Sequence, residues 1–463
     1  MPVRTEEESL GTRVARGGIW VALSSWFNVV FGFLANIVLT RLLSPEDFGI
    51  FALGMFFFSL LNLRPRIGIG QAFAQRRETD GELIGTHLAL DLTAGLCTLL
   101  IVSLSLPVLG WFEYPVEVGW ATLALGIIGI SDSVLGTAWV MLDKELHFSK
   151  TSLVSSLAFP LSYVPGLWLA WKGGGYWSIV VQNGAYALLL LGGMWWTARR
   201  KLPELWNLPW RWNGRTAREL VRFGGVVGLA SIAGLLVNQL DNYLVGTFLG
   251  LATLGFYDRA WRIAMWPSLL VGNVIHRAGF FTYARFQGDP ERLRRVVMLT
   301  VWLVATLALP LALAVFVSAR DLVELLYGPR WVPSALLLRF LVALSVLRPL
   351  QDNAGSFFMA VGRPGLPARM TAIQAGVLAL SAVPLTLAYG AVGTCLGVGI
   401  SYAVSLPLLY RPLFRTLELS PADTVVLPAL AACLALGVSW VFSDRVGLET
   451  LSLAGKVLVK GAV

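Results

Sequence analysis

The segment Arg16–Leu53, with the sequence RGGIWVALSSWFNVVFGFLANIVLTRLLSPEDFGIFAL, recurs without a gap at Arg222–Arg259, with the sequence RFGGVVGLASIAGLLVNQLDNYLVGTFLGLATLGFYDR. Identical residues at aligned positions include Arg16/Arg222, Gly18/Gly224, Ser25/Ser231, Leu34/Leu240, Asn36/Asn242, Leu43/Leu249 and Gly49/Gly255. Each copy consists of a long apolar segment, a short turn that ends in glycine and a second apolar segment. Duplicated sets of hydrophobic helices are common in transporters, where a substrate path lies between the halves. The repeat therefore predicts two related helical halves.

The composition is that of a membrane protein. Hydrophobic residues make up 56% of the 463 residues and charged residues 14%, whereas soluble domains contain about 25% charged residues. Stretches of about 20 apolar residues, the length that crosses a bilayer core, recur along the chain. Helices satisfy their own backbone hydrogen bonds in lipid, so we expect an all-α polytopic fold without a large soluble domain. The net charge of +9 is attributed to cytoplasmic loops near anionic membrane lipids and not to binding of nucleic acid.

The hydrophobic pattern predicts thirteen spans in two lobes. They lie near residues 18–40, 48–63, 87–110, 119–142, 152–171, 176–197, 224–245, 255–276, 296–318, 331–351, 370–389, 391–410 and 422–442. The predicted domains are an N-terminal six-helix lobe at 1–198, a basic cytoplasmic interfacial linker at 199–222, a C-terminal six-helix lobe at 223–412 and a peripheral region at 413–463. An even number of spans separates the two copies of the repeat, so the lobes are pseudo-symmetric about an axis along the membrane normal.

The distribution of basic residues predicts the orientation. With the N-terminus inside, the inside segments hold 25 Lys and Arg residues and the outside loops hold 5. Cytoplasmic loops of membrane proteins are enriched in these residues, so we expect a cytoplasmic N-terminus. The linker carries Trp206, Trp210 and Trp212 among basic residues, which is typical of a segment lying on the membrane surface. The tail from Val446 to Val463 fits either a shortened fourteenth span or an interfacial helix.

Charged side chains within the spans are the candidate functional residues, because charge is costly in a membrane interior. The predicted substrate-binding residues are Arg259, Arg262, Arg339 and Asn242. The candidates for an ion-coupling or cavity role are Asp91, Asp132, Asp241 and Asp258. Arg339 lies about eight residues inside its helix, roughly 12 Å from the outer end. A guanidinium at this depth suits a phosphate or pyrophosphate, which it can bind bidentately.

The repeat shows that the scaffold does not need these charges. Asp241, Asp258, Arg259 and Arg262 align with Ala35, Ala52, Leu53 and Phe56. Charges confined to one lobe predict a cavity whose ionic wall lies on the C-terminal side. Structural roles compete with this interpretation. Asp258 with Arg262, and Arg348 with Asp352, have the i, i+4 spacing of ion pairs within one helix, while Asp91 and Asp132 fit helix packing as well as cation or proton binding.

The sequence predicts no metal site, cofactor or catalytic centre. The three cysteines, Cys97, Cys395 and Cys433, lie in apolar runs and lack metal-ligand spacing. The three histidines, His87, His147 and His276, also lack zinc spacing. The chain contains no phosphate-binding Gly-rich loop, H-E-x-x-H motif or G-x-S-x-G motif. ATP-driven and hydrolytic chemistry therefore receive no support.

Several short motifs resemble a known family. Arg16-Gly17-Gly18 and the run Leu42–Gly49 (LLSPEDFG) resemble the opening of bacterial polysaccharide exporters of the oligosaccharide-flippase (Wzx-type) family. That family belongs to the multidrug/oligosaccharidyl-lipid/polysaccharide superfamily. Leu254–Ala260 (LGFYDRA) and Gly362-Arg363-Pro364 are similar to further elements of the family. The resemblance covers nearly the whole chain, although the C-terminus is shorter than the commoner fourteen-span plan.

The resemblance implies two six-helix lobes around a central cavity, with one or two peripheral C-terminal helices. It implies that an undecaprenyl-pyrophosphate-linked oligosaccharide crosses the bacterial inner membrane by alternating access, with coupling to H⁺ or Na⁺. Other polysaccharide assembly proteins are candidate partners. The family has no strict catalytic signature, so it assigns no site residue.

Two other function classes remain open. A cation-coupled multidrug exporter of the same superfamily would favour an acidic cavity, which the arginines of the C-terminal lobe do not match. A membrane enzyme such as a glycan polymerase or ligase would need a large outside loop to position donor and acceptor. The longest predicted outside loops have about a dozen residues, which is short for such a site.

Overall fold

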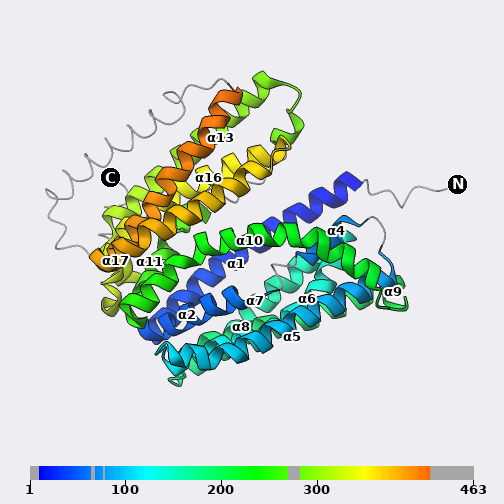
Figure 1. Ribbon diagram of the computed structural model, residues 1–463, viewed down its shortest axis with the longest axis horizontal. Helices are drawn as coiled ribbons and strands as arrows, with labels where there is room; N and C mark the ends of the chain where they lie inside the picture. Colours follow the sequence, from blue (N-terminus) through cyan, green and yellow to red (C-terminus); the bar gives the residue numbers. More distant parts are fainter. Residues whose placement is uncertain (1–9, 64–67, 77–78, 270–281, 418–463) are drawn as a thin grey trace. The chain divides into compact units, whose positions relative to one another are not determined.

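The computed structural model describes residues 10–63, 68–76, 79–269 and 282–417, without the side chains of 10–19, 22 and 223–231. The described residues form helices joined by short turns and contain no strand (Figure 1). Eight of these helices are long and apolar enough to cross a membrane. The predicted all-α polytopic class is therefore confirmed. The predicted span 422–442, the tail, His276 and Cys433 lie outside the described residues.

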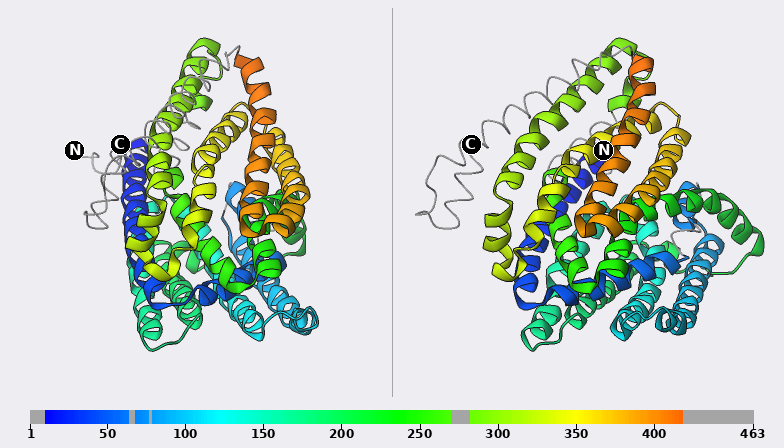
Figure 2. Two further views of the ribbon diagram at one scale, coloured as in Figure 1. Left: turned by 90° about the vertical axis from the view of Figure 1, so that its left-hand side faces the viewer. Right: turned by 60° about the vertical axis from the view of Figure 1, so that its left-hand side comes forward.

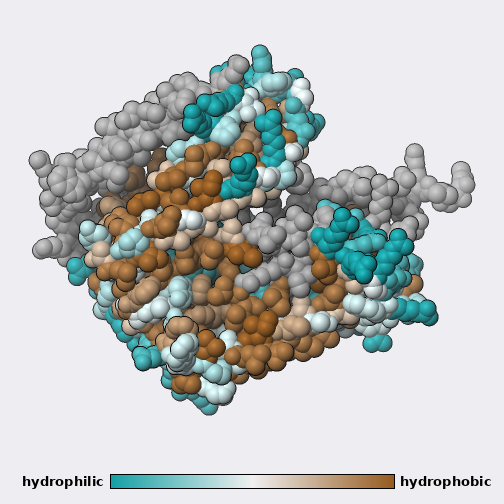
Figure 3. Space-filling view, viewed as in Figure 1, coloured by the Kyte–Doolittle hydropathy of each residue, from teal (hydrophilic) through white to brown (hydrophobic). Residues whose placement is uncertain are grey.

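The chain divides into two compact units, Met1–Ile232 and Ala233–Val463. The first unit contains α1 (Leu10–Leu42), α2 (Pro45–Leu61), α4 (Ile69–Gln75), α5 (Gly81–Trp111), α6 (Val116–Lys144), α7 (Phe148–Trp171), α8 (Trp177–Lys201) and α9 (Pro203–Trp206). Helix α7 packs against α1 and α8, and α6 packs against α2, α5 and α8. Hydrophobic side chains cover the middle of these helices, and hydrophilic ones gather near α9 (Figure 3).

Helix α10 (Gly214–Leu249) begins in the first unit and continues into the second. The second unit then contains α11 (Leu251–Ala264), α13 (Pro290–Val317), α14 (Ala319–Tyr327), the 3₁₀ helix η1 (Pro329–Trp331), α15 (Ser334–Leu341), α16 (Leu344–Ala360) and α17 (Gly365–Leu417). Helices α13, α16 and α17 lie side by side (Figures 1 and 2). Within the described residues, the first twelve predicted spans fall on helices, and residues 270–276 of the eighth span lie outside the described residues.

The structure corrects one predicted span and agrees with the predicted boundary between two others. The tenth span, predicted as one helix at 331–351, is interrupted at Val342–Ala343 and divides into α15 and α16. The eleventh and twelfth spans form α17, which breaks at Gly390 with φ 61° and ψ −145°, between the predicted ends at 389 and 391. Gly393 and Gly397 lie directly against Leu385 and Ala382 of the preceding arm. The absence of side chains at these glycines lets the two arms pack closely.

The sequence repeat is also a structural repeat, because α1 and α2 correspond to α10 and α11. The turn of the first copy is capped by Ser44, which accepts a hydrogen bond from the backbone N–H of Asp47, while the Asp47 carboxylate accepts from Ser44. This reciprocal capping box stabilises the start of α2. The second copy places Gly250 in the same turn with φ 88°, a conformation that glycine adopts without strain. Different local chemistry thus forms a turn at the same aligned position in both copies.

Helices α5 and α13 begin alike. The side chain of Asp80 accepts a hydrogen bond from the Leu83 N–H at the start of α5, at 2.7 Å. The side chain of Asp289 accepts from the Arg292 N–H at the start of α13, at 3.0 Å. Both carboxylates cap helix N-termini, where negative charge is favoured. Each acidic loop therefore caps the helix that follows it.

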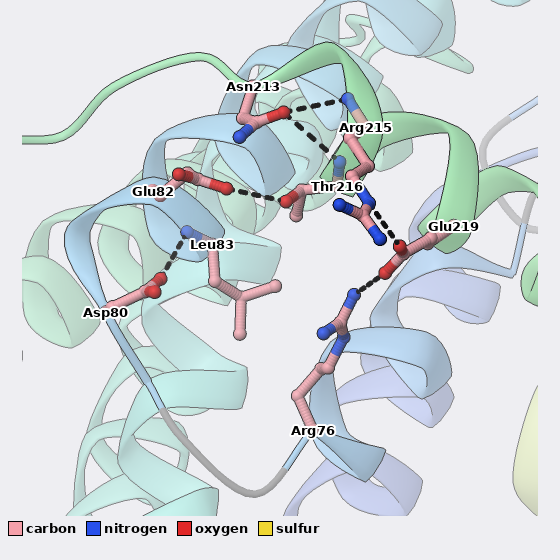
Figure 4. A network of polar contacts seen from close by, with 8 residues as sticks. All are labelled: Arg76, Asp80, Glu82, Leu83, Asn213, Arg215, Thr216 and Glu219. Carbon is pink, nitrogen blue, oxygen red and sulfur yellow. Dashed lines mark hydrogen bonds and ion pairs between the residues drawn. The ribbon is translucent and has the colours of Figure 1, made fainter.

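The segment between α8 and α10 is docked against the first unit. The Arg211 N–H donates to the Gly81 carbonyl at 3.2 Å, and the Asn213 N–H donates to the Thr86 hydroxyl at 3.0 Å. Thr216 donates to Glu82 at 2.7 Å, and Glu219 forms ion pairs with Arg76 and Arg215 (Figure 4). This network attaches the start of α10 to the N-terminal end of α5.

The tryptophans of this segment divide into two groups. Trp206 and Trp210 pack against Trp195 of α8, with ring centroids 5.3–5.7 Å apart. Trp212 is 58% exposed. The sequence pattern predicted a segment that lies on the membrane surface, which stays a prediction, and within this segment Trp206 and Trp210 pack against Trp195. Aromatic packing and backbone hydrogen bonds therefore hold the segment in place, and only Trp212 of these three keeps an exposed ring.

We predict that Gly85→Ala loosens this segment. A Cβ at Gly85 would lie 2.7 Å from the backbone nitrogen of Arg211 and 2.8 Å from its carbonyl oxygen, so the segment must shift at a cost of about 1–3 kcal/mol. Trypsin should then cleave after Arg211 or Arg215 faster than in the wild-type protein. Gly110→Ala is the matched control on the same helix, because a Cβ at Gly110 would meet no atom within 4 Å. Equal cleavage rates for Gly85→Ala and wild type would contradict the proposed docking.

Candidate functional site

A buried carboxylate lies in the C-terminal unit. Asp241 of α10 is 2% exposed, and its Oδ2 accepts a hydrogen bond from the Tyr257 hydroxyl of α11 at 2.7 Å. Its Oδ1 accepts from the Asn242 N–H at 2.9 Å. The aligned residues of the first copy, Ala35 and Phe51, are also buried. The same scaffold therefore accepts an apolar pair at these positions, so the polar pair in the second copy is not required by the fold.

More polar side chains surround this pair. Arg348 of α16 donates to the Asn238 side chain of α10 at 3.0 Å. Tyr402 is buried on α17 within electrostatic range of Arg348 and Asp241. The Gln351 amide of α16 donates to Gln374 of α17 at 2.6 Å. We call this group, which spans α10, α11, α16 and α17, the Asp241 cluster.

Sequence reasoning identified only part of the Asp241 cluster. It named Asp241 but missed Tyr257, Tyr402 and Gln374, because uncharged polar residues are common in membrane helices. The replacement of Phe51 by Tyr257 between the two copies of the repeat was the available signal. The sequence analysis considered Arg348 as a partner of Asp352 on the same helix, and in the structure its guanidinium donates to the Asn238 side chain of α10.

A second charged group lies on α11. Asp258 accepts hydrogen bonds from Arg259, at 3.0 Å from its Nε, and from Arg262, at 3.3 Å. Arg259 is 1% exposed, whereas the Arg262 side chain is 46% exposed. The aligned residue of the first copy, Leu53, is buried too, so Arg259 occupies a core position of the scaffold. The i, i+4 ion pair between Asp258 and Arg262 is present, and a substrate contact by Arg259 stays a prediction.

The other two predicted binding residues are Arg339, which lies on α15, and Asn242, which is next to Asp241 on α10. Arg339 is exposed in the last turn of α15, with its guanidinium 6.0 Å from the Phe316 ring centroid. Helix C-termini favour positive charge, which gives Arg339 a structural reason to lie just before the break at Val342. Asn242 donates to Gln239 on the same helix at 3.1 Å. Their substrate-binding roles stay predictions.

The two acidic candidates of the N-terminal unit lie on neighbouring helices. Asp91 of α5 is buried, and Asp132 of α6 is partly buried within electrostatic range of Tyr186 of α8. Within the described part of the chain, no group of three or more His, Cys, Asp or Glu side chains is arranged to hold a metal ion. The roles of Asp91 and Asp132 in coupling or packing stay predictions.

The geometry supports two kinds of chemistry in the C-terminal unit. A buried carboxylate with a hydroxyl donor can exchange a proton or a monovalent cation when water reaches it. The group of two arginines and one aspartate on α11 carries a net positive charge, and its exposed Arg262 can bind an anion. An exposed guanidinium, here also that of Arg339, binds phosphate oxygens through parallel N–H donors.

We predict that Tyr257→Phe destabilises the protein more than the double change Asp241→Ala/Tyr257→Phe. The single change removes the hydroxyl donor from a buried carboxylate, which costs about 1–3 kcal/mol. The double change recreates the apolar pair Ala35 and Phe51 of the first copy. The thermal midpoint of the detergent-solubilised protein measures both effects as a double-mutant cycle. A lower midpoint for the double variant than for Tyr257→Phe would show that the fold itself needs Asp241.

Comparisons with known proteins agree with this architecture. The chain is 22% identical over 413 residues to the lipopolysaccharide biosynthesis protein WzxC of Escherichia coli, covering 87% of this chain and 81% of WzxC. The fold is similar to the lipid II flippase MurJ in an inward closed conformation, with a TM-score of 0.76, 13% identity and 96% of both chains covered. It also resembles an inward-facing multidrug resistance MATE transporter of the MOP superfamily, with a TM-score of 0.66 and 15% identity. This match covers 85% of the present chain and 96% of the transporter.

The family model described as "Polysaccharide biosynthesis protein" matches residues 38–336, which is more than half of the chain. The matched region begins in α1 and ends in α15, so it includes the turn of both copies of the repeat and both residues of the Asp241–Tyr257 pair. This agrees with the resemblance seen in the motifs of the sequence. The chain belongs to the polysaccharide biosynthesis protein family of multi-pass membrane proteins.

Proposed function

We propose that this protein is a flippase that moves an undecaprenyl-pyrophosphate-linked oligosaccharide across the bacterial inner membrane, with its N-terminus in the cytoplasm. The two related units would expose the substrate path to one side of the membrane and then to the other. Membership of the polysaccharide biosynthesis family supports the substrate class. The likeness to MurJ supports a fold able to accommodate a lipid-linked sugar. The enzyme class is not favoured, because the family resemblance points to transport.

The observation that carries this proposal is the presence of exposed cationic side chains within spans of the second unit. Arg262 takes the position of the buried Phe56 in the first copy and is exposed. Arg339 is exposed on α15, inside the tenth span. Exposed charge within a span faces water or substrate, because lipid cannot solvate it. These two guanidinium groups would bind the pyrophosphate, while the polyprenyl chain stays in the bilayer.

Arg259 and Asn242 have secondary roles in this proposal. Arg259 would contact substrate only after its ion pair with Asp258 opens, and in the present arrangement it holds Asp258 in place. Asn242 would orient the Asp241 carboxylate through the hydrogen bond that its backbone N–H donates to Asp241. Anionic lipids would surround the basic cytoplasmic segments, and other polysaccharide assembly proteins would deliver or receive the substrate.

Asp241 is the leading candidate for coupling transport to H⁺ or Na⁺. It is buried, hydrogen-bonded to Tyr257 and not needed by the scaffold. Asp91, Asp132 and Asp258 are further candidates, of which Asp258 is already neutralised by two arginines. A carboxylate can bind H⁺ or Na⁺ when the substrate path is open to one side of the membrane and release it when the path is open to the other side. Ion movement is then coupled to the conformational change.

The alternative is a cation-coupled multidrug exporter, which the similarity to a MATE transporter keeps in view. Its substrates would be lipophilic cations, and exposed arginines such as Arg262 and Arg339 would repel them. Rhodamine-type dye binding to the purified protein, together with drug resistance in a sensitive host, would favour this alternative.

We predict that Arg262→Ala and Arg339→Ala each reduce surface glycan export about 10- to 100-fold, because each removes charge-assisted hydrogen bonds of about 1.5–3 kcal/mol. Surface glycan in the producing strain is measured alongside protein level in the membrane, which should not change. Arg292→Ala is the control, because it removes an exposed arginine that pairs locally with Asp289 at the start of α13. Wild-type export in both test variants would remove these residues from the binding site.

A further inference from the structure

Three N–H groups of two arginines on α11 point at one carboxylate oxygen. The Nε atom of Arg259 donates to the Oδ2 atom of Asp258 at 3.0 Å, and the Nη2 atom of Arg259 donates to the same oxygen. The Nε atom of Arg262 donates to it at 3.3 Å. Guanidinium groups bind carboxylate and phosphate oxygens with the same N–H donors. The Asp258 oxygen therefore lies where these arginines can also hold a phosphate oxygen.

Helix geometry accounts for only one of the two ion pairs. Asp258 and Arg262 have the i, i+4 spacing of side chains that share a helix face, whereas adjacent residues such as Asp258 and Arg259 do not face each other. Arg259 starts from the core position that the buried Leu53 occupies in the first copy. Its guanidinium nevertheless reaches the neighbouring carboxylate. Because leucine fills the same position in the first copy, folding does not require this arrangement.

The three side chains differ in accessibility. The Arg259 side chain is buried, that of Asp258 is 16% exposed and that of Arg262 is 46% exposed. A buried guanidinium that loses its anionic partner is strongly destabilising, so Arg259 needs an anion beside it in every state of the protein. The exposed Arg262 offers a dissolved or lipid-borne anion a place to bind next to this buried group.

Aromatic side chains lie beside the arginines. Tyr327 of α14 is buried within electrostatic range of both guanidinium groups. The ring of Trp331 packs against Tyr327 and against Phe256 of α11, with centroids 6.0 Å and 5.8 Å apart. Charge-assisted hydrogen bonds are stronger in such apolar surroundings than in water, and an unpaired charge is more costly there. Exchange of one anion for another is therefore favoured over loss of the anion.

We propose that Asp258 occupies the place of a phosphate group, and that a phosphate of the substrate displaces it from both arginines. The incoming anion bonds first to the exposed Arg262 and then replaces the Asp258 oxygen at Arg259, while the carboxylate turns away. This inference rests on the proposed flippase function and deepens it. It gives Asp258 a role in substrate release in place of a role in ion coupling.

An internal competitor lowers the affinity of a binding site. A ligand binds only to the molecules whose site is open, so its apparent affinity falls in proportion to their fraction. Asp258 keeps the site filled and therefore weakens pyrophosphate binding, which allows the substrate to leave after transport. A purely structural partner would have the opposite effect, because its removal would disorder the arginines and weaken binding.

Isothermal titration calorimetry of the full-length protein in lipid nanodiscs tests this proposal with inorganic pyrophosphate. Asp258→Asn should lower the Kd about 10-fold, because a neutral amide competes only weakly for the guanidinium groups. Asp258→Glu is the matched control, which keeps the carboxylate and should bind like the wild type. Asp258→Ala/Arg259→Leu/Arg262→Phe carries the residues of the first copy at all three positions, and it should fold and not bind.

A parallel titration with undecaprenyl pyrophosphate in the nanodisc identifies the source of the phosphate. A tighter Kd of Asp258→Asn for both ligands would support the exchange and assign the site to the lipid headgroup. A tighter Kd for inorganic pyrophosphate alone would support the exchange and assign the site to a free phosphate anion.

Unchanged or weaker binding of both ligands by Asp258→Asn would overturn the proposal. If this variant does not fold alone, purification in pyrophosphate should yield monodisperse protein, because the bound anion replaces the carboxylate. Failure of this rescue would also overturn the proposal. If export still depends on Arg262 and Arg339 in either case, only the exchange fails. If export is independent of these arginines as well, the proposed function fails with it.

Discussion

The scarcity of hydrogen-bonding partners in hydrocarbon is the constraint on which this structure depends. Most side chains in the membrane helices are apolar, so each polar group within a span needs a protein partner or contact with water. Asp241 has Tyr257, and Asp258 has Arg259 and Arg262. Arg348 has Asn238. These interactions of the second unit combine groups from α10, α11 and α16.

Duplication separates the requirements of the fold from those of function. The first copy builds its helix–turn–helix with Ala35, Phe51 and Leu53 in buried positions, and the second places Asp241, Tyr257 and Arg259 at the same buried positions. One copy thus serves as an internal control for the other. The scaffold does not need these polar groups, and burying them is costly. Binding of a ligand or an ion explains their presence best.

Periodicity and composition were sufficient to predict the helices and the repeat, because both depend on local chemistry. The break between α15 and α16 was missed, since no Gly or Pro marks Val342–Ala343. The inward packing of Trp206 and Trp210 was also missed, because interfacial and packed tryptophans have the same sequence pattern. Partners across helices, such as Arg348 with Asn238, depend on tertiary packing that a single sequence does not reveal.

The central claim is that the polar residues of the second copy serve transport and not folding. The most direct test replaces Asp241, Tyr257 and Arg262 by the first-copy residues Ala, Phe and Phe, and measures flipping of undecaprenyl-pyrophosphate-linked N-acetylglucosamine in proteoliposomes. We predict a folded variant, with wild-type membrane level and thermal midpoint, that does not move the lipid. A variant that transports at the wild-type rate would contradict it, and so would one that fails to fold.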